Sequence, residues 1–208
     1  MLTLTKKSAA VIRLARKGSI RARELSALGI PRAYLGRLVQ RGLLTQTGKG
    51  LYELPDARHT ELQSVAETAK RLPHATICLI SALQMHGLTS ELPHAVWLQI
   101  DTHARKPRST ATKLEIIRAS GSALSHGIEE RTVEGVPVKL TTPAKTVADC
   151  FRFRRHVGLE VALTALREYL AKGRGRKRAG DFSVTALLAA AKADRISSVI
   201  RPYVEALS

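Results

Sequence analysis

The chain of 208 residues carries 34 lysines and arginines against 17 aspartates and glutamates, a formal net charge of +17. Such an excess repels itself and is relieved by a polyanion, so nucleic acid is the first partner to consider and an anionic membrane surface the second. Hydrophobic residues make up 44% of the chain, enough for a real core, but no run of about 18 apolar residues exists, which excludes a membrane-spanning helix.

The amino terminus, MLTLTKKSAA, has no apolar segment after its lysines, so we expect no secretory signal. Cys78 and Cys150 lie in apolar surroundings, and we expect both to be buried free thiols in a reducing compartment. These features favour a cytoplasmic protein.

The first quarter of the chain is predicted to form three helices and a hairpin. The helices are expected at residues 7–16, 22–28 and 31–41, with a short extended piece at 19–20. Gly29 suits a tight turn before the third helix, and Pro31 suits its first turn. Strands at 43–46 and 51–54 would flank the tip Gly48-Lys49-Gly50. Helix, helix, turn, helix, hairpin is the order of a winged helix-turn-helix.

The third helix has an apolar face and a face suited to DNA. Leu35, Leu38 and Val39 fall on one side. The other side is expected to present small or polar residues, namely Ala33, Gly36, Arg37 and Gln40, with Arg32, Tyr34 and Arg41 beside them. Arg37 and Gln40 are the candidates for reading base edges in the major groove. The alternative is an ordinary surface helix with a solvated face.

Other cations of this part are candidates for backbone contacts. Arg32 and Arg41 are expected to meet phosphates, and Lys49 a phosphate or the minor groove. Further backbone contacts are expected from Lys6, Lys7, Arg21 and Arg23. Tyr34 could hydrogen-bond a phosphate or pack against the first helix. Residues 1–57 hold eleven Lys or Arg against three Asp or Glu, which solubility alone hardly explains.

The break at Pro55-Asp56-Ala57 predicts two domains, residues 1–57 and 58–208. The second is expected to be a mixed α/β domain with a helical end, which makes the whole chain α+β. Its predicted helices cover 60–72, 81–86, 142–153, 158–171, 183–193 and 196–207, and its predicted strands cover 75–80, 96–100, 114–118, 128–133 and 136–140. The strand 96–100 alternates little, so we expect both of its faces to be buried.

Three blocks in this order resemble the AbiEi family, the antitoxins of type IV toxin–antitoxin systems. The blocks are GLLTQTGKGLYEL at 42–54, ICLISALQMHGL at 77–88 and VKLTTPAKTVADCF at 138–151. The resemblance implies a winged helix-turn-helix that binds inverted repeats in its own promoter, as a dimer or cooperatively. It also implies an antitoxin domain opposing a nucleotidyltransferase-like toxin, with or without a stable complex.

Two features depart from the family pattern. Arg21 stands where such domains more often have Ser or Thr, so the cap of the second helix is weaker or comes from Ser19. Acidic residues expected on a toxin-facing surface are not obvious. Two further cationic groups could extend the DNA track or meet an acidic toxin face, although such runs are usually only solvated; they are Arg105, Lys106 and Arg108, and Arg174, Arg176, Lys177 and Arg178.

Nothing in the sequence predicts an enzyme, a cofactor or a metal site. The histidines are scattered singly, and no Walker or GxGxxG loop is present. Ser81 lacks the glycines of a nucleophile elbow and is expected to cap a helix. Asp149 has no acidic neighbour in sequence and is interpreted as structural. Two other hypotheses stay open. One is a regulator whose second domain senses a small molecule in an apolar pocket. The other is a nuclease fused to a DNA reader, which would need clustered acids with a nearby lysine, whereas the acids of this chain are scattered.

Overall fold

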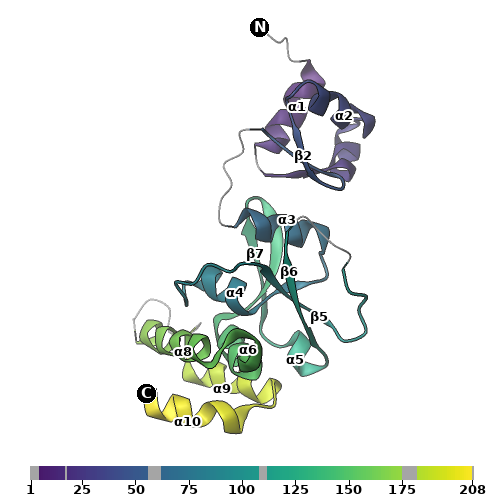
Figure 1. Cartoon of the computed structure of the whole chain (residues 1–208). Helices are drawn as coiled ribbons and strands as arrows, with labels where there is room; N and C mark the ends of the chain where they lie inside the picture. The colour runs from purple at the N-terminus through teal and green to yellow at the C-terminus, as the bar shows by residue number, and fades with distance from the viewer. Residues whose placement is uncertain (1–4, 17, 56–61, 108–111, 175–181, 208) are drawn as a thin grey trace.

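The computed structural model describes residues 5–16, 18–55, 62–107, 112–174 and 182–207. A small N-terminal unit stands above a larger unit that ends in a layer of helices (Figure 1). The predicted fold class, α+β with a winged helix-turn-helix, a mixed sheet and a helical C-terminal end, is confirmed. The boundary predicted after residue 57 lies outside the described residues and stays a prediction.

The N-terminal unit has the predicted order of helices and hairpin. Its elements are α1 (Lys6–Ala15), β1 (Ile20–Arg21), the 3-10 helix η1 (Ala22–Leu28), α2 (Ala33–Gln40), β2 (Thr45–Gly48) and β3 (Leu51–Glu53). The three strands form an antiparallel sheet in the order β1-β3-β2. The hairpin of β2 and β3 is the wing.

A cluster of buried aliphatic side chains holds this unit together, with Val11, Leu25, Leu35 and Leu38 fully buried. Leu25 and Leu28 are predicted as inward-facing residues of the second helix, but only Leu25 is buried, whereas 49% of Leu28, the last residue of η1, is exposed. Arg21 precedes this helix and forms no side-chain capping bond, in agreement with the weak cap predicted for it.

The third helix is shorter than predicted. It begins at Ala33 and not at Pro31, because Arg32 is the N-cap residue. Gly29 has a φ of 64°, in the left-handed region, and closes the preceding 3-10 helix with backbone bonds from its own amide and that of Ile30. This turn sets the direction in which α2 leaves, and so carries out the role predicted for Gly29.

The larger unit contains a mixed five-stranded sheet in the order β6-β5-β4-β8-β7. Its strands are β4 (Thr76–Ile77), β5 (Val96–Asp101), β6 (Leu114–Ala119), β7 (Ile128–Val133) and β8 (Val136–Thr141). Its helices are α3 (Gln63–Arg71), α4 (Leu79–His86), α5 (Ser122–Ser125), α6 (Pro143–Arg152), α7 (Arg154–Val157), α8 (Leu159–Gly173), α9 (Val184–Ala193) and α10 (Ser197–Leu207). The hairpin and the helix begun by Thr142-Pro143 lie where the sequence predicted them.

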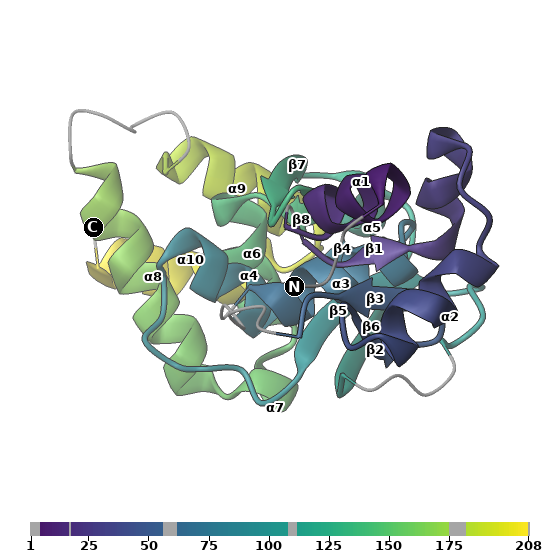
Figure 2. The same ribbon diagram turned by 90° about the horizontal axis from the view of Figure 1, so that it is seen from above.

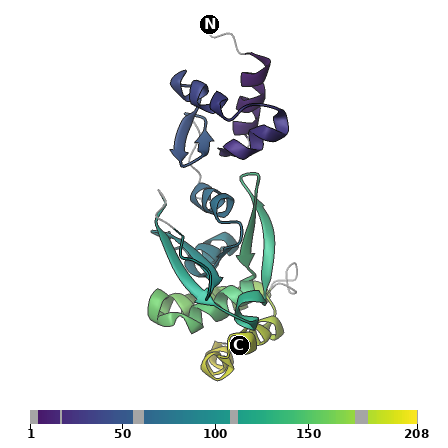
Figure 3. The same cartoon turned by 90° about the vertical axis from the view of Figure 1, so that its right-hand side faces the viewer.

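Two hydrophobic clusters cover the two faces of this sheet. Val96, Leu98 and Ile100 pack in the cluster that contains α3, whereas Trp97 belongs to the cluster of α6 and α8 to α10. The strand β5 is therefore buried on both faces, as its sequence predicted. Helix α3 lies between the wing and the sheet (Figure 3).

Some local predictions were wrong. The run predicted as a strand at 75–80 changes to helix at Leu79, since a short apolar run has no period that separates strand from buried helix. The short helices α5 and α7 were not predicted. Ser81 caps no helix: its Oγ accepts a hydrogen bond of 3.0 Å from the backbone N–H of Trp97 and ties α4 to β5, while Cys78 is the N-cap residue.

Cys78 and Cys150 are buried free thiols, as predicted. Burial raises the pKa of both thiols well above the ordinary value. Among the described residues, no helix is long and apolar enough to span a membrane.

Candidate nucleic-acid interface

Helix α2 divides its residues between core and solvent. Leu35 and Leu38 are fully buried, whereas Ala33, Gly36, Arg37 and Gln40 are exposed on the other side. Arg32 and Arg41, at the two ends of the helix, are exposed as well. The structure thus brings the predicted base-reading residues onto one solvent-facing surface.

Gly36 is not required by the packing of the fold. A Cβ at this position would meet nothing within 4 Å, and its backbone is helical. Glycine weakens a helix interior by about 1 kcal/mol relative to alanine, so the position carries a cost without a benefit to stability. The packing of the chain gives no reason for a glycine here.

The wing places its tip beside the 3-10 helix. Lys49 is exposed at the turn, and Gln46 Nε2 donates a hydrogen bond of 3.1 Å to the carbonyl of Gly48. The backbone N–H of Ala22 donates to the carbonyl of Gly50 at 3.3 Å, which connects the tip to η1. A register shift between Gln46 and Gly48 bends the strand at this place.

Five cationic side chains line an open groove of about 510 Å³ beside the wing. They are Arg21, Arg23, Arg32, Lys49 and Arg71, together with Ala22 and Gly50. The first four were predicted separately as backbone contacts, and the structure brings them together. Arg71 was not predicted, because it lies on α3, beyond the winged helix, and only the packing of α3 under the wing brings it here.

The groove is electrostatically unbalanced. Among the described residues, none of the five cations forms an ion pair with a carboxylate. Burial, followed by the neighbouring charge of Arg23, lowers the pKa of Arg21; Glu24 opposes this shift, and Arg71 adds to it. The guanidinium still stays charged at any physiological pH. An anion in the groove would relieve this repulsion.

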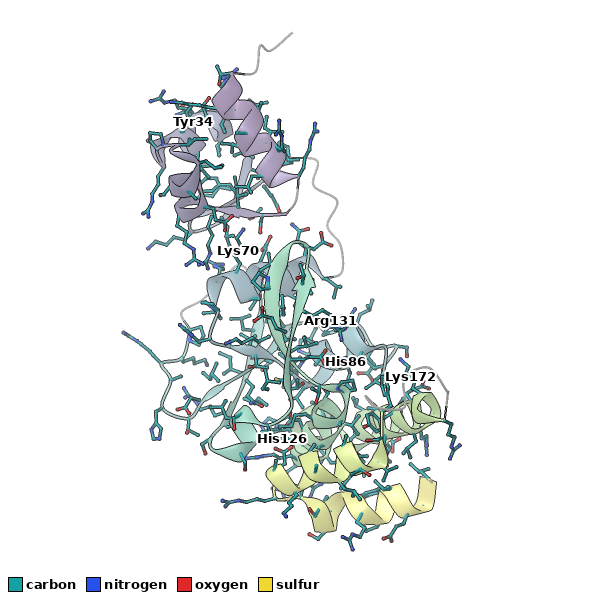
Figure 4. All side chains as sticks on the ribbon, turned by 180° about the vertical axis from the view of Figure 1, so that it is seen from behind. Tyr34, Lys70, His86, His126, Arg131 and Lys172 are labelled. Carbon is teal, nitrogen blue, oxygen red and sulfur yellow. The ribbon has the colours of Figure 1, made fainter. Side chains whose placement is uncertain are left out.

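A tie between the two units lies next to the groove. Lys70 Nζ is 2.9 Å from Glu24 Oε1 and also donates to the backbone carbonyl of Ser19 (Figure 4). At the other end of α3, Gln63 Nε2 donates to the buried carboxylate of Glu53 at the end of the wing. Both contacts hold α3 against the N-terminal unit.

The remaining predicted residues lie elsewhere or are engaged. Tyr34 Oη is 2.9 Å from Thr5 Oγ1, so its hydroxyl bonds to the start of α1. Arg105 and Lys106 are exposed after β5, and Arg174 donates to the carbonyl of Leu207, at the helical end remote from α2 (Figure 2). The other cations predicted in these two runs lie outside the described residues; they are Arg108, Arg176, Lys177 and Arg178. The side chain of Lys6 is also outside the described part of the structure.

The larger unit contains a buried charge cluster that sequence reasoning missed. Lys145 lies between Asp149 and Asp194, with Nζ 2.9 Å from Asp194 Oδ1 and a shorter contact to Asp149 Oδ1. The three side chains are at most 1% exposed, so the cluster is structural, as interpreted for Asp149 alone. Within the described ranges, no three His, Cys, Asp or Glu side chains are grouped to hold a metal ion.

The helices and hairpin of the N-terminal unit form a winged helix-turn-helix. Residues 10–55 match the family model described as the AbiEi antitoxin transcriptional regulator. The match confirms the resemblance to the AbiEi family for this N-terminal part of the chain.

One solved structure shares the fold over nearly the whole chain. The crystal structure of the RV2827C protein from Mycobacterium tuberculosis is similar with a TM-score of 0.57 and 12% sequence identity. The match covers 98% of this chain and 82% of that protein. Among curated proteins, no sequence matches this chain significantly.

Proposed function

We propose that the protein is a sequence-specific DNA-binding repressor of its own promoter whose second domain acts as a type IV antitoxin. The observation that carries the DNA-binding part is the solvent-facing side of α2, which exposes Arg37, Gln40 and Gly36. The N-cap residue of the same helix, Arg32, lines the groove of unpaired cations. Arg and Gln offer paired hydrogen bonds to base edges, and a glycine lets the backbone approach them.

The proposed roles divide between reading and positioning. Arg37 and Gln40 read bases, whereas Arg21, Arg23, Arg32, Arg41 and Lys49 contact phosphates. One small domain offers few base contacts, so two copies on an inverted repeat supply the specificity of a promoter site. The domain boundary near residue 57 is part of this proposal.

A gel-shift titration of the region upstream of the gene tests the DNA-binding part. We expect wild type to retain this DNA more strongly than an unrelated duplex, and more weakly as salt rises. The double variant Arg37→Ala with Gln40→Ala should weaken binding by about 1–3 kcal/mol for each base contact that it removes, and should bind both duplexes alike. Arg167→Ala, an exposed cation of α8, is the matched control. Wild-type behaviour of the double variant contradicts the role of α2.

The antitoxin part rests on the AbiEi match of residues 10–55 and on the order of the sequence blocks beyond it. The opposing protein is a nucleotidyltransferase-like toxin. Growth of cells that express the neighbouring gene, with and without this protein, tests this part. Rescue by a chain that carries Arg37→Ala and Gln40→Ala would separate neutralisation from repression, whereas absence of rescue by wild type contradicts the antitoxin role.

Neither alternative is favoured by a specific observation. A cavity of about 230 Å³ lies beside β5 and is lined by Ser81, Gln84 and Leu92, among others. Small-molecule sites usually measure roughly 300–1,000 Å³, so this cavity gives the sensor hypothesis little support. The nuclease hypothesis needs acids with a lysine, and the cluster of Lys145, Asp149 and Asp194 has this composition but no access to solvent.

A further inference from the structure

We infer that Arg71, a residue of the larger unit, contacts a backbone phosphate of DNA in the groove that it shares with Lys49 of the wing. The inference rests on the DNA-binding function proposed above and extends the interface beyond residues 10–55. It makes the second unit a participant in DNA binding and not only the bearer of a separate function.

The first argument is the place of the Arg71 side chain against the wing. A Cβ on Gly48 would lie 3.3 Å from Arg71 Nη1 and 3.5 Å from its Cζ. The guanidinium therefore lies next to the backbone of the wing at a residue that has no side chain. From there it lines the same groove as Arg21, Arg23 and Lys49.

The second argument is that α3 is tied to the N-terminal unit near both of its ends. Lys70, the preceding residue, bonds to Glu24 and to the carbonyl of Ser19, and Gln63 bonds to Glu53. A third close approach joins the units, because a Cβ on Gly18 would lie only 2.5 Å from the carbonyl oxygen of Glu134. The helix that carries Arg71 is thus held under the wing, so binding costs less conformational freedom.

The third argument is charge. Glu24 is the acid closest in sequence to Arg21 and Arg23, and it is engaged by Lys70. The groove thus gathers like charges that no described carboxylate pairs. A row of phosphates suits several cations spread along an open groove better than one small anion does. Continuity with Arg32, at the start of α2, favours the duplex that α2 is proposed to read.

A salt titration of the full chain with a mixed-sequence, fluorescein-labelled DNA duplex tests this contact by anisotropy. On B-DNA, the slope of log affinity against log salt falls by about 0.9 for each phosphate that is no longer neutralised. Arg71→Ala and Arg71→Gln should both show this fall in slope. The ratio of wild-type affinity to variant affinity should then change roughly threefold between about 50 and 200 mM salt. Arg71→Lys should keep most of the slope, because it keeps the charge. The control is Arg167→Ala, which removes one exposed cation of α8.

The outcomes separate this inference from the function on which it rests. Suppose that wild type binds DNA with a steep dependence of affinity on salt, and that Arg71→Ala and Arg71→Gln show the same dependence. This result overturns the contact of Arg71 with DNA and leaves the proposed function standing. Wild type without salt-sensitive binding to any DNA removes both. Tighter binding of an RNA duplex of the same sequence overturns the assignment to DNA. Thermal melting of each variant verifies that it is folded.

Discussion

Lys70 of α3 pairs with Glu24 of the 3-10 helix across the junction of the two units, with Nζ 2.9 Å from Oε1. Burial, opposed by the bond to Glu24, lowers the pKa of Lys70. Because the same ammonium donates to the carbonyl of Ser19, the contact joins one side chain of the larger unit to two groups of the smaller. Arg71 is the next residue of α3, so we expect its position to depend on this junction.

This dependence predicts coupling between Lys70 and Arg71 in DNA binding. In a Lys70→Met background the junction loses the bonds to Glu24 and to Ser19 at the end of α3 that carries Arg71, so the fall in salt slope caused by Arg71→Ala should shrink. Residues of one network typically couple by about 0.5–3 kcal/mol. A double-mutant cycle of DNA affinities from the same anisotropy titration measures this coupling. Additive effects of the two substitutions would mean that Arg71 reaches DNA without the junction, or not at all.

Substitutions of Gly36 should separate the stability of the protein from its binding to DNA. Gly36→Ala should raise the free energy of unfolding by about 0.5–1 kcal/mol, because the site is an exposed helical position with open space around it. Gly36→Leu should also fold, yet bind the upstream DNA poorly, because its side chain would stand between the helix and the base edges. Urea denaturation and gel shifts measure the two effects.

Gly42 is the matched control for that experiment. It also has open space, but its φ is 66°, so Gly42→Ala should destabilise the protein where Gly36→Ala stabilises it. If Gly36→Leu binds the upstream DNA like wild type, the solvent-facing side of α2 does not enter the major groove of the DNA.

The sequence was sufficient for features set by short-range patterns. The spacing of Leu35 and Leu38 predicted which side of α2 is buried, and Thr142-Pro143 predicted the start of α6 within one residue. The position of Arg71 beside the wing could not be predicted, and neither could the contact of Lys145 with Asp194. Both bring together residues that are far apart in the chain, and no local pattern encodes which surfaces pack together.

The type of a short helix was also beyond the sequence. The segment 22–28 was predicted as a helix, but only the structure shows that it is a 3-10 helix with Leu28 exposed. The missing cap at Arg21 weakens the first turn, and the choice between the two helix types then depends on packing. The transition from β4 to α4 was missed for a related reason, because Leu79 and Ile80 are buried whichever structure they adopt.

The buried cluster predicts unequal effects of three substitutions. Lys145→Met leaves Asp149 buried without a cation and Asp194 with Arg152 alone, and should cost about 3–5 kcal/mol of the free energy of unfolding. Asp149→Asn should cost less than about 1.5 kcal/mol, since it resembles a protonated Asp149 and leaves Asp194 paired with Lys145 and Arg152. Asp194→Asn should fall between them, because it removes the carboxylate that both cations share.

The pH dependence of the same variants tests the protonation of Asp149. Burial raises its pKa to about 8, and the carboxylate of Asp194 adds to the effect, although Lys145 opposes it. A raised carboxyl pKa gives stability that is present at low pH and is lost as pH rises from about 4 towards 8. Asp149→Asn has no carboxyl group to ionise and cannot lose this stability. Its free energy of unfolding should therefore rise relative to that of wild type as pH increases across this window. A constant difference would show that Asp149 is ionised throughout.

His86 predicts pH dependence of the opposite sign. Burial lowers its pKa, and the cations of Arg131, whose Nη2 lies 3.5 Å from Nδ1, and Lys172 act in the same direction (Figure 4). The hydrogen bond of 2.7 Å from Nε2 to the carbonyl of Thr141 and the charge of Glu129 oppose this shift without reversing it. The folded protein thus favours the neutral imidazole. Its contribution to stability should be complete above the unfolded pKa of about 6.5 and fall as pH drops below it, by at most about 1.4 kcal/mol per pH unit.

Urea denaturation of wild type and His86→Gln between about pH 5 and 8 measures this contribution, because the effect of Asp149 cancels in their difference. The stability advantage of wild type should narrow in acid. Arg131→Met should retain more of its stability in acid than wild type does, because it removes the cation that faces Nδ1. Glu129, which pairs with Arg131 at 2.6 Å, and Lys172, which donates to the carbonyl of His86, are unchanged in His86→Gln. An advantage that widens in acid would mean that the imidazole is charged in the folded protein.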